Sequence, residues 1–382
     1  MAGSGGSALQ SRLILPKRRR MQKAVQFPFI AALALAVGIT ASASPESGTE
    51  SAGSSVAYSL VKSIPLGAPD RWDYVVYDAP SHRVYVAHGD RVTVVDGRDG
   101  SIVGQVEGLA GGTHGIAISH VAGRGYTDDG QAGQAASFDL KTLQVVKRLK
   151  AQDDADAITL DPTSGHIFVV NSEPGTLTVI DPQSDEVVAM VDAGSKLEYA
   201  VAGANGKVYA NGVAKRQIIR IDTASNRVDA TWPMPDCAAP HGLAIDTSRH
   251  RLFSSCQNSR LVVINADTGA VLATLPIGAG TDAAAFDSKH KLIFSSNGID
   301  GTISVIREIN ADTFVPAGTL KTQSSARTMS VDPRSGRLYV AAADVDAKAL
   351  AALQGARSPV SPPRRMPLVA GSLKLLFFDP VH

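Results

Sequence analysis

The sequence repeats itself at nearly constant intervals, and this period constrains the fold more than any other feature. Seven segments begin alike, and their successive starting points lie 41, 42, 42, 43, 41 and 45 residues apart. Six of the segments carry four short apolar stretches separated by polar turns, and period-2 alternation favours strands over helices. A period of about 40–45 residues is typical of one four-stranded blade of a β-propeller. The sequence therefore predicts an all-β, seven-bladed β-propeller. The first residues of the segments are Asp73, His114, Asp156, Glu198, His241, Asp282 and Arg327.

Short polar residues recur at the turns of each segment. A side-chain oxygen at the start of a turn can accept a hydrogen bond from a backbone N–H about two residues later, which closes the turn locally. We therefore predict structural roles for these residues. The first turns open with Asp78, Asp161, Asp246, Asp287 and Asp332, and the second turns with Asp96, Asp139, Asp181, Asp222 and Asn265.

The seventh segment lacks its fourth strand, and the N-terminal part of the chain supplies a candidate. Residues 58–67 match the fourth strands of the other segments, whereas the C-terminal end adds only the apolar stretch 373–378. We expect the two to pair and close the ring, because closure removes exposed sheet edges. A Pro-rich insertion at 343–371 interrupts this segment. It could form a lid, a docking arm or an irregular surface loop.

The first 43 residues have the composition of an export signal. Basic residues at 17–23 precede roughly a dozen apolar residues, and Ala41-Ser42-Ala43 fits a cleavage site. The apolar core is short for a membrane span, so a retained anchor is the alternative, and Met21 is an alternative start to Met1. We expect cleavage near Ala43, a flexible leader at 44–56, a propeller at 57–382, and a periplasmic or secreted protein. We expect it to be a monomer without a transmembrane segment.

Charge and cysteine content narrow the function further. The chain has 37 Lys and Arg against 36 Asp and Glu, a net charge of +1, so no basic field favours nucleic acid. We expect no nucleic-acid partner. The chain has two cysteines, Cys237 and Cys256. In an exported protein they predict one disulfide, and two separate buried thiols are the alternative.

The repeats resemble a known family. The pattern D-P-x-S/T followed by Y/F-V, T-V-x-V-I-D and V-V-x-x-I is similar to the YVTN-type repeat of exported, YncE-like bacterial β-propellers. The segments at Trp72-Asp73-Tyr74, 282–286 and 326–329 carry the resemblance most closely, and it extends from about Leu60 to the end. The resemblance implies a periplasmic or surface propeller whose ligand is undefined. Some similar proteins are called lactonases on fold analogy alone.

All seven first residues are ionisable, and in a propeller they surround one mouth of the central channel. We expect this set, together with His88, Asn171 and Asn297 at the ends of second strands, to form a charged funnel that binds a ligand. His114 and His241 with Asp73, Asp156 or Asp282 could hold a divalent metal ion, the only cofactor suggested. Arg327 could meet an anion.

Three interpretations of the funnel remain open. The polar residues could hold neighbouring blades together, bind a small molecule or an envelope protein, or catalyse a reaction. As catalytic candidates, His114, His241 and Arg327 could open a lactone or act on a sugar acid. The sequence contains no nucleophile elbow, zinc-protease, phosphate-loop or dinucleotide motif. We therefore favour a binding or scaffolding protein, with an enzyme of the lactonase type as the alternative.

Overall fold

The computed structural model describes residues 55–355 and 366–381, within a compact unit that spans Ala52–His382. The predicted signal, the cleavage site, the two candidate start sites and nearly all of the leader lie outside these residues. In the described part, the strands form seven four-stranded sheets. Their bounds are β2 (Val75–Asp78), β3 (Arg83–His88), β4 (Arg91–Asp96) and β5 (Ile102–Val106) in blade 1; β6 (Ile116–Ser119), β7 (Arg124–Asp129), β8 (Gln134–Asp139) and β9 (Val145–Lys150) in blade 2; β10 (Ala155–Leu160), β11 (Ile167–Asn171), β12 (Thr176–Asp181) and β13 (Glu186–Asp192) in blade 3; β14 (Leu197–Ala202), β15 (Lys207–Gly212), β16 (Gln217–Asp222) and β17 (Arg227–Pro233) in blade 4; β18 (Pro240–Asp246), β19 (Arg251–Cys256), β20 (Arg260–Asn265) and β21 (Val271–Pro276) in blade 5; β22 (Thr281–Asp287), β23 (Leu292–Asn297), β24 (Thr302–Asn310) and β25 (Thr313–Lys321) in blade 6; and β26 (Thr328–Val331), β27 (Leu338–Ala342), β28 (Lys374–Pro380) and β1 (Tyr58–Pro65) in blade 7.

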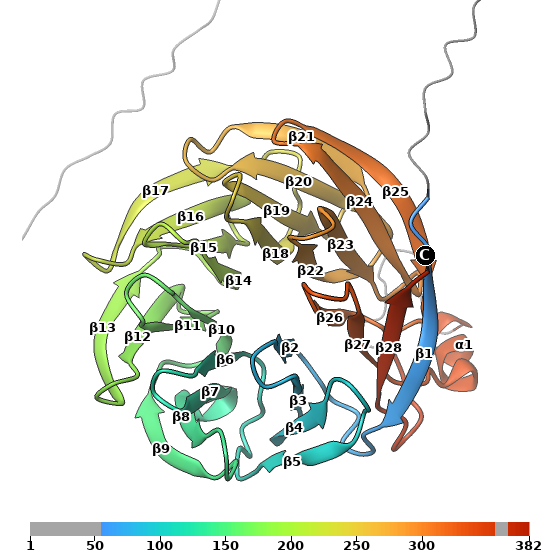
Figure 1. Ribbon diagram of the computed structural model, residues 1–382, viewed down its shortest axis with the longest axis horizontal. Helices are drawn as coiled ribbons and strands as arrows, with labels where there is room; N and C mark the ends of the chain where they lie inside the picture. The colour runs from blue at the N-terminus through green and yellow to red at the C-terminus, as the bar shows by residue number, and fades with distance from the viewer. Residues whose placement is uncertain (1–54, 356–365, 382) are drawn as a thin grey trace, which may run out of the picture. The chain divides into compact units, whose positions relative to one another are not determined.

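The seven sheets stand around a central channel, with the first strand of each blade innermost and the last outermost (Figure 1). All neighbouring strands within a blade are antiparallel, and in blades 1 to 6 they are joined by short connections. The prediction of an all-β, seven-bladed propeller is confirmed.

The N-terminal strand closes the ring. β1 pairs with β28 from Tyr58 opposite Pro380 to Pro65 opposite Lys374, and it forms the outer strand of blade 7. The predicted closure of the seventh blade is confirmed. Because the other three strands of this sheet come from the C-terminal part of the chain, the two ends of the propeller stabilise each other.

The turn aspartates work as the sequence predicts. Asp161 accepts hydrogen bonds from the backbone N–H groups of Thr163 and Ser164, and Asp181 accepts one from Gln183. Asn265 replaces Asp in the second turn of blade 5 and accepts from the N–H of Asp267. Each side chain closes its turn within a few residues, which leaves these groups fully occupied by the fold.

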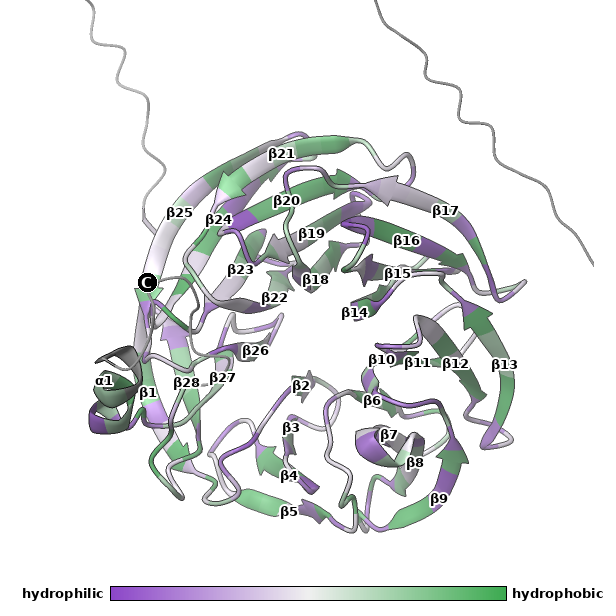
Figure 2. Ribbon diagram, turned by 180° about the vertical axis from the view of Figure 1, so that it is seen from behind, coloured by the Kyte–Doolittle hydropathy of each residue, from purple (hydrophilic) through white to green (hydrophobic). Residues whose placement is uncertain are grey.

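The core lies between the blades. Val, Ile and Ala of the middle strands are fully buried, and Figure 2 shows hydrophobic strands joined by hydrophilic turns. Buried tyrosines link neighbours: the Tyr126 hydroxyl donates to Asp185, Tyr209 to the Ala266 carbonyl and Tyr339 to the Gly97 carbonyl. These bonds fix the spacing between blades while their rings fill the interface.

The insertion of blade 7 contains a helix that the sequence did not indicate. Helix α1 (Ala347–Gly355) lies on the outer side of the propeller beside β1, and an isolated bridge between Val345 and Leu368 ties the base of the insertion together. A short 3-10 helix, η1 (Gly130–Ala132), joins β7 to β8. No helix in residues 55–355 or 366–381 is long and apolar enough to cross a membrane.

Candidate functional site

β-bulges position the first residues of blades 3 to 6. In these blades the register between first and second strands shifts directly after the opening pair, between Ala155 and Ile158 in blade 3 and between Leu197 and Ala200 in blade 4. The same shift occurs between Pro240 and Leu243 and between Thr281 and Ala284. A bulge leaves its extra residue unpaired and turns its side chain away from the regular alternation. The bulges therefore contain Asp156, Glu198, His241 and Asp282.

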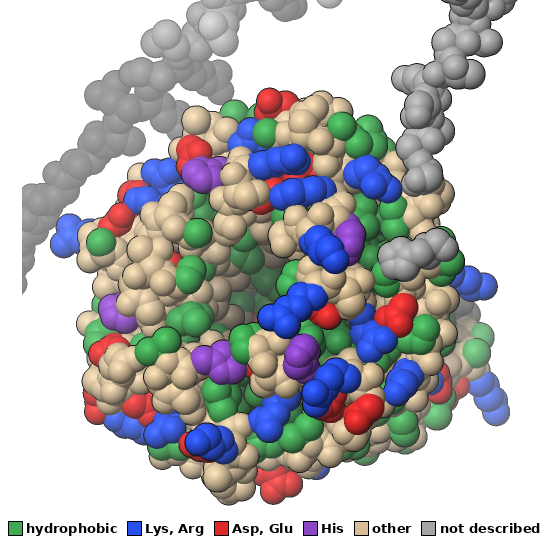
Figure 3. All heavy atoms as spheres, viewed as in Figure 1, with side chains coloured by type: hydrophobic (Ala, Val, Ile, Leu, Met, Phe, Trp, Pro, Cys, Tyr) green, Lys and Arg blue, Asp and Glu red, His purple; other side chains and the backbone are tan. Residues whose placement is uncertain are grey.

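The remaining first residues precede their strands. Asp73 and His114 each lie two positions before a first strand, and Arg327 lies one position before β26. We call the set Asp73, His114, Asp156, Glu198, His241, Asp282 and Arg327 the charged ring. The channel that it lines opens as a hollow at the centre of the molecule, with Lys, Arg and His side chains around it on the face drawn in Figure 3.

Two glycines allow the blades to approach each other at this level. Gly115 and Gly242 directly follow the two ring histidines, and the Gly115 N–H donates to the Asp156 carbonyl of the next blade at 2.9 Å. A Cβ atom on Gly115 would overlap the backbone at Asp156 and Ile158, and one on Gly242 would overlap Ala283 and Ala284. The His-Gly pairs in the sequence are thus explained by backbone packing as well as by the histidines.

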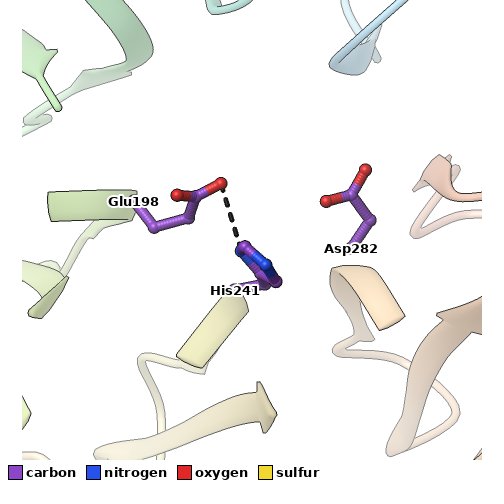
Figure 4. Close-up of side chains that lie close together, drawn as sticks. All are labelled: Glu198, His241 and Asp282. Atoms are coloured by element: carbon purple, nitrogen blue, oxygen red, sulfur yellow. Dashed lines mark ion pairs between the residues drawn. The ribbon is translucent and has the colours of Figure 1, made fainter. Parts of the chain in front are cut away.

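Blades 4 to 6 bring three potential ligand groups together. Glu198 Oε1 lies 3.2 Å from His241 Nδ1, and donor atoms of Glu198, His241 and Asp282 all lie within 4.8 Å of one another (Figure 4). Asp282 Oδ2 lies 3.4 Å from the Arg327 guanidinium. About a quarter of each of the Glu198, His241 and Asp282 side chains remains exposed, at 23%, 24% and 23%. The cluster is therefore open to a ligand in the channel.

Blade 2 contributes a histidine held by a buried aspartate. Asp128 is fully buried and accepts hydrogen bonds from His114 Nδ1 at 2.7 Å and from the N–H groups of His114 and Gly115. His114 Nε2 lies 3.4 Å from the Arg71 guanidinium. Burial alone would lower the pKa of His114, but Asp128 outweighs it and raises the pKa to about 9. His114 is therefore a positively charged group of fixed orientation at neutral pH.

The ring carboxyl groups are held in unfavourable surroundings for their charged forms. Burial raises the pKa of Asp73 to about 6 even though Arg327 opposes the change. Burial, with the neighbouring Asp73 and Glu198, raises the pKa of Asp156 well above its usual range, and burial also raises that of Asp282. For His241, burial disfavours the charged form, but Glu198 outweighs it and raises the pKa. Several ionisable groups with strongly altered pKa values, gathered in one place, are a physical sign of a functional site.

Two polar atoms of the ring lack hydrogen-bond partners among the described residues. They are His241 Nδ1 and Asp282 Oδ2, both shielded from solvent. Buried polar atoms are satisfied in the great majority of cases because an unsatisfied one costs free energy. Both atoms do lie in ion pairs that cross from one blade to the next, His241 Nδ1 with Glu198 at 3.2 Å and Asp282 Oδ2 with Arg327 at 3.4 Å. These charge pairs lack hydrogen-bond geometry, which a further partner in the channel could supply.

Two tyrosines that directly follow ring residues in the sequence meet across the channel. Tyr74 of blade 1 and Tyr199 of blade 4 belong to blades that are not neighbours, yet their ring centroids lie 4.6 Å apart. Burial, and secondarily the nearby carboxylates, raise the pKa of both hydroxyl groups. The two rings therefore meet across the channel next to the charged ring.

Three residues predicted to join the ring lie elsewhere. His88 is fully buried and contacts the Thr93 hydroxyl and the carbonyls of Gly67 and Pro69. Asn171 and Asn297 are also fully buried, and their amide groups contact hydroxyl groups of their own blades. The structure does not bring these three side chains to the charged ring, since their polar atoms are already used by the fold.

Sequence reasoning missed Asp128, Arg71 and the tyrosine pair. A signal for Asp128 existed, because the next-to-last position of the second strand is also polar in blades 4, 5 and 6. There Asn211, Ser255 and Ser296 hydrogen-bond to backbone groups at the start of a first strand, as Asp128 does. No repeat position marks Arg71, which lies in the connection before blade 1.

The predicted disulfide between Cys237 and Cys256 is present. Cys237 lies in the connection that enters blade 5, four residues before His241, and Cys256 is the last residue of β19. Both sulfur atoms are fully buried, so the bond fixes the segment leading to the ring. A disulfide is consistent with an exported protein.

Two hollows on the surface do not include ring residues. One, of about 210 Å³, is lined by Tyr58, His290 and Arg307 among others, and a second, of about 60 Å³, lies around Tyr209 and His250. Neither hollow gathers several groups with altered pKa values as the charged ring does; only the hydroxyl groups of Tyr58 and Tyr209, whose pKa values are raised by burial, lie there. The chemistry therefore favours the ring over the hollows defined by shape alone.

No protein-family model matches the sequence. The chain is 22% identical to proteins named uncharacterized protein YncE from Salmonella typhi and from Salmonella typhimurium strain LT2, over 189 residues. These matches cover 47% of this chain and 53% of the length of each relative. Among solved structures, a chain of Kuenenia stuttgartiensis hydrazine synthase superposes with a TM-score of 0.62 and 14% identity, over 70% of this chain and 91% of that chain, which reports on the fold alone. The chain is thus a seven-bladed β-propeller distantly similar to YncE.

Proposed function

We propose that this protein is an exported binding module of the cell envelope that captures a small charged molecule in the pocket lined by the charged ring. The observation that carries the proposal is the convergence of seven ionisable side chains from seven blades, two of which keep polar atoms without hydrogen-bond partners. Residues that only joined blades would be satisfied by backbone groups, as Asn211 and Ser296 are. A ligand would add hydrogen-bond partners for these two atoms, whose present contacts are ion pairs at 3.2 and 3.4 Å.

The ligand carries both a cationic and an anionic part in this proposal. The pocket contains both acidic and cationic groups. The acidic groups are the carboxyl groups of Asp73, Asp156, Glu198 and Asp282, and the cationic groups are Arg327, Arg71 and the His114 imidazolium. Guanidinium groups recognise carboxylates in a fixed planar geometry, and this favours organic acids over neutral molecules. The segments that resemble YncE-like propellers are compatible with such a role.

Binding can be tested with variants that remove one ring charge each. A panel of sugar acids, dicarboxylates and amino acids is screened by thermal shift, and hits are measured by calorimetry. We expect Arg327→Gln and Asp156→Asn to weaken a hit by about tenfold or more, since each hydrogen bond to a charged group contributes roughly 1.5–3 kcal/mol. Arg260→Gln, at an exposed position of β20, is the matched control. Equal affinity in all three variants would contradict the proposal.

An enzyme of the lactonase type is the second candidate, and the His114 geometry favours it. Asp128 holds Nδ1, and Nε2 lies 3.4 Å from Arg71, so His114 could exchange a proton with a substrate beside an anion-binding group. Hydrolysis of a sugar lactone adds water and breaks the ring C–O bond. A panel of lactones with Ca²⁺, Mg²⁺ or Zn²⁺ tests this activity. Turnover that is lost in His114→Gln supports the enzyme, and no turnover on any lactone removes it.

A further inference from the structure

We infer that Glu198, His241 and Asp282 bind one divalent transition-metal cation. The inference rests on the proposed function, because it uses part of the same pocket, and it names the chemical class of one ligand. It also changes the set of metal ligands expected from the sequence: Glu198 enters, whereas His114 is already occupied by Asp128.

The three groups are nearly placed for coordination. Their donor atoms lie within 4.8 Å of one another, and the His241 Nδ1 to Glu198 Oε1 distance is 3.2 Å. Ligand atoms about 2.0–2.2 Å from a zinc-sized cation lie roughly 3–3.5 Å apart. The Glu198 and His241 pair already has this spacing, so a small rotation of the Asp282 side chain completes the set. All three point toward the channel from separate strands (Figure 4).

The unpartnered atoms belong to two of these three residues. His241 Nδ1 and Asp282 Oδ2 have no hydrogen-bond partner in the described part of the chain, although Nδ1 lies beside the Glu198 carboxylate. The nitrogen and that oxygen can meet favourably through a proton on the nitrogen or through a cation next to it. A cation shared by the nitrogen and both carboxylates satisfies all three groups at once.

Carboxyl groups outnumber the cationic side chains at the ring. Asp73, Asp128, Asp156, Glu198 and Asp282 gather here with Arg71, Arg327, His114 and His241. A bound cation would lie among these carboxyl groups, and Arg327, whose guanidinium lies 3.4 Å from Asp282, contacts one of the proposed ligands.

The ligand types select the metal class. One imidazole nitrogen and two carboxylates suit Zn²⁺, Mn²⁺, Fe²⁺, Co²⁺ or Ni²⁺ better than Ca²⁺ or Mg²⁺, which prefer oxygen ligands alone. Thiolate does not compete, because the two cysteines of the chain form the disulfide. Three protein ligands leave further coordination positions open to the channel, where an organic acid could bind.

Cobalt provides a direct test. Tag-free protein is stripped with a chelator, dialysed, and titrated with Co²⁺ while its visible absorption is recorded. We expect one Co²⁺ per chain in the wild type. Glu198→Gln, His241→Gln and Asp282→Asn should each weaken binding by at least about tenfold. His250→Gln is the matched control, because His250 pairs with Asp267 on the surface and should bind Co²⁺ no differently from the wild type.

The outcomes separate this inference from the proposed function. The inference is overturned if stoichiometric binding is absent, or if the three ring variants, shown by circular dichroism to be folded, bind Co²⁺ as tightly as the control. If an organic acid still binds the chelator-treated protein in a manner that depends on Asp156 and Arg327, the pocket function stands without the metal. If Co²⁺ binds at the three residues but no organic molecule does, the metal site stands alone.

Discussion

The two ends of one strand give opposite roles to the same amino acid. At the end of β22, Asp287 is fully buried and accepts hydrogen bonds from the N–H groups of Lys289 and His290 and from His290 Nδ1. At its start, Asp282 is partly exposed, one of its oxygens has no hydrogen-bond partner, and burial raises its pKa. Asp287 completes a turn, whereas the charged form of Asp282 lowers the stability of the folded state. Departures of this kind from local consistency are expected where a protein binds something.

The same contrast holds along β18. Its last residue, Asp246, receives the Ser248 N–H and hydroxyl and lies 3.0 Å from Lys291 Nζ. Burial opposes its charged form, but these partners outweigh it and lower the pKa of Asp246 to about 2. At the start of β18, His241 Nδ1 lies 3.2 Å from Glu198 without hydrogen-bond geometry. The aspartate at the turn end is therefore well satisfied by its neighbours, whereas the histidine at the ring end is not.

The largest expected effect tests how strictly the backbone is placed at the ring end. Gly242→Ala puts a Cβ atom into the backbone of Ala283 and Ala284, and we expect a loss of about 3 kcal/mol in the free energy of unfolding. Urea denaturation measures it. Gly104→Ala on outer strand β5 is the control, because only the flexible end of Leu143 is in its way. If both variants lose equal stability, close packing is not special to the ring end.

A smaller effect compares the two aspartates of β22 directly. Asp287→Asn should cost about 2 kcal/mol, since a buried carboxylate with three donors loses part of its hydrogen bonding. Asp282→Asn should leave stability unchanged or raise it slightly, because it removes an unfavourable charge. Thermal unfolding in the presence of a chelator measures both. A larger loss in Asp282→Asn than in Asp287→Asn would reverse the comparison.

The smallest effect concerns an exception at the turn end. The Glu308 carboxyl is fully buried and lies 3.4 Å from Arg249. Burial, and secondarily Asp246, raise its pKa to about 7. The folded state then binds a proton that the unfolded state releases above its ordinary pKa near 4.5.

The direction of the pH dependence follows from this difference in pKa between the folded and the unfolded state. Glu308 contributes most to stability at low pH, and the contribution is lost as pH rises from about 4.5 to 7, by at most about 1.4 kcal/mol per pH unit. Glu308→Gln should flatten this dependence and unfold at a higher urea concentration than the wild type at pH 8. Unfolding curves at pH 5, 6, 7 and 8 measure it. A slope unchanged by the substitution would show that Glu308 is ionised throughout.

Most of the fold could be predicted from the sequence because its signals are local and repeated. The period of the seven segments, the turn aspartates and the unmatched strand at 58–67 are each readable within a few residues. The helix at 347–355 was not readable, since it lies in the one stretch that no other segment repeats. The disulfide was predicted because an exported chain with two cysteines offers one pairing.

The candidate site was predicted only in outline. The first residues of the blades could be aligned, so the charged ring was predictable as a set. Which members touch could not be, because the contact between Glu198 and His241 depends on bulges that shift register by one residue. His88 and Asn297 are polar residues at strand ends like ring residues, and only their hydrogen bonds to nearby groups show that the fold uses them. Tyr74 and Tyr199 meet across the axis, and a repeat pattern contains no information on such contacts.

The pairing of β1 with β28 also determines when the pocket can exist. Arg327 stacks on the Trp72 ring at 5.2 Å and donates to the Trp72 carbonyl, so this corner spans the seam between the last blade and the first. During synthesis β1 emerges before all ring residues, and its partner β28 emerges after all of them. A nascent chain that stops before residues 374–380, or a chain clipped to remove residues 58–65, would retain every ring residue and still lack the pairing that closes blade 7. The charged ring is thereby aligned only when both of these strands are present.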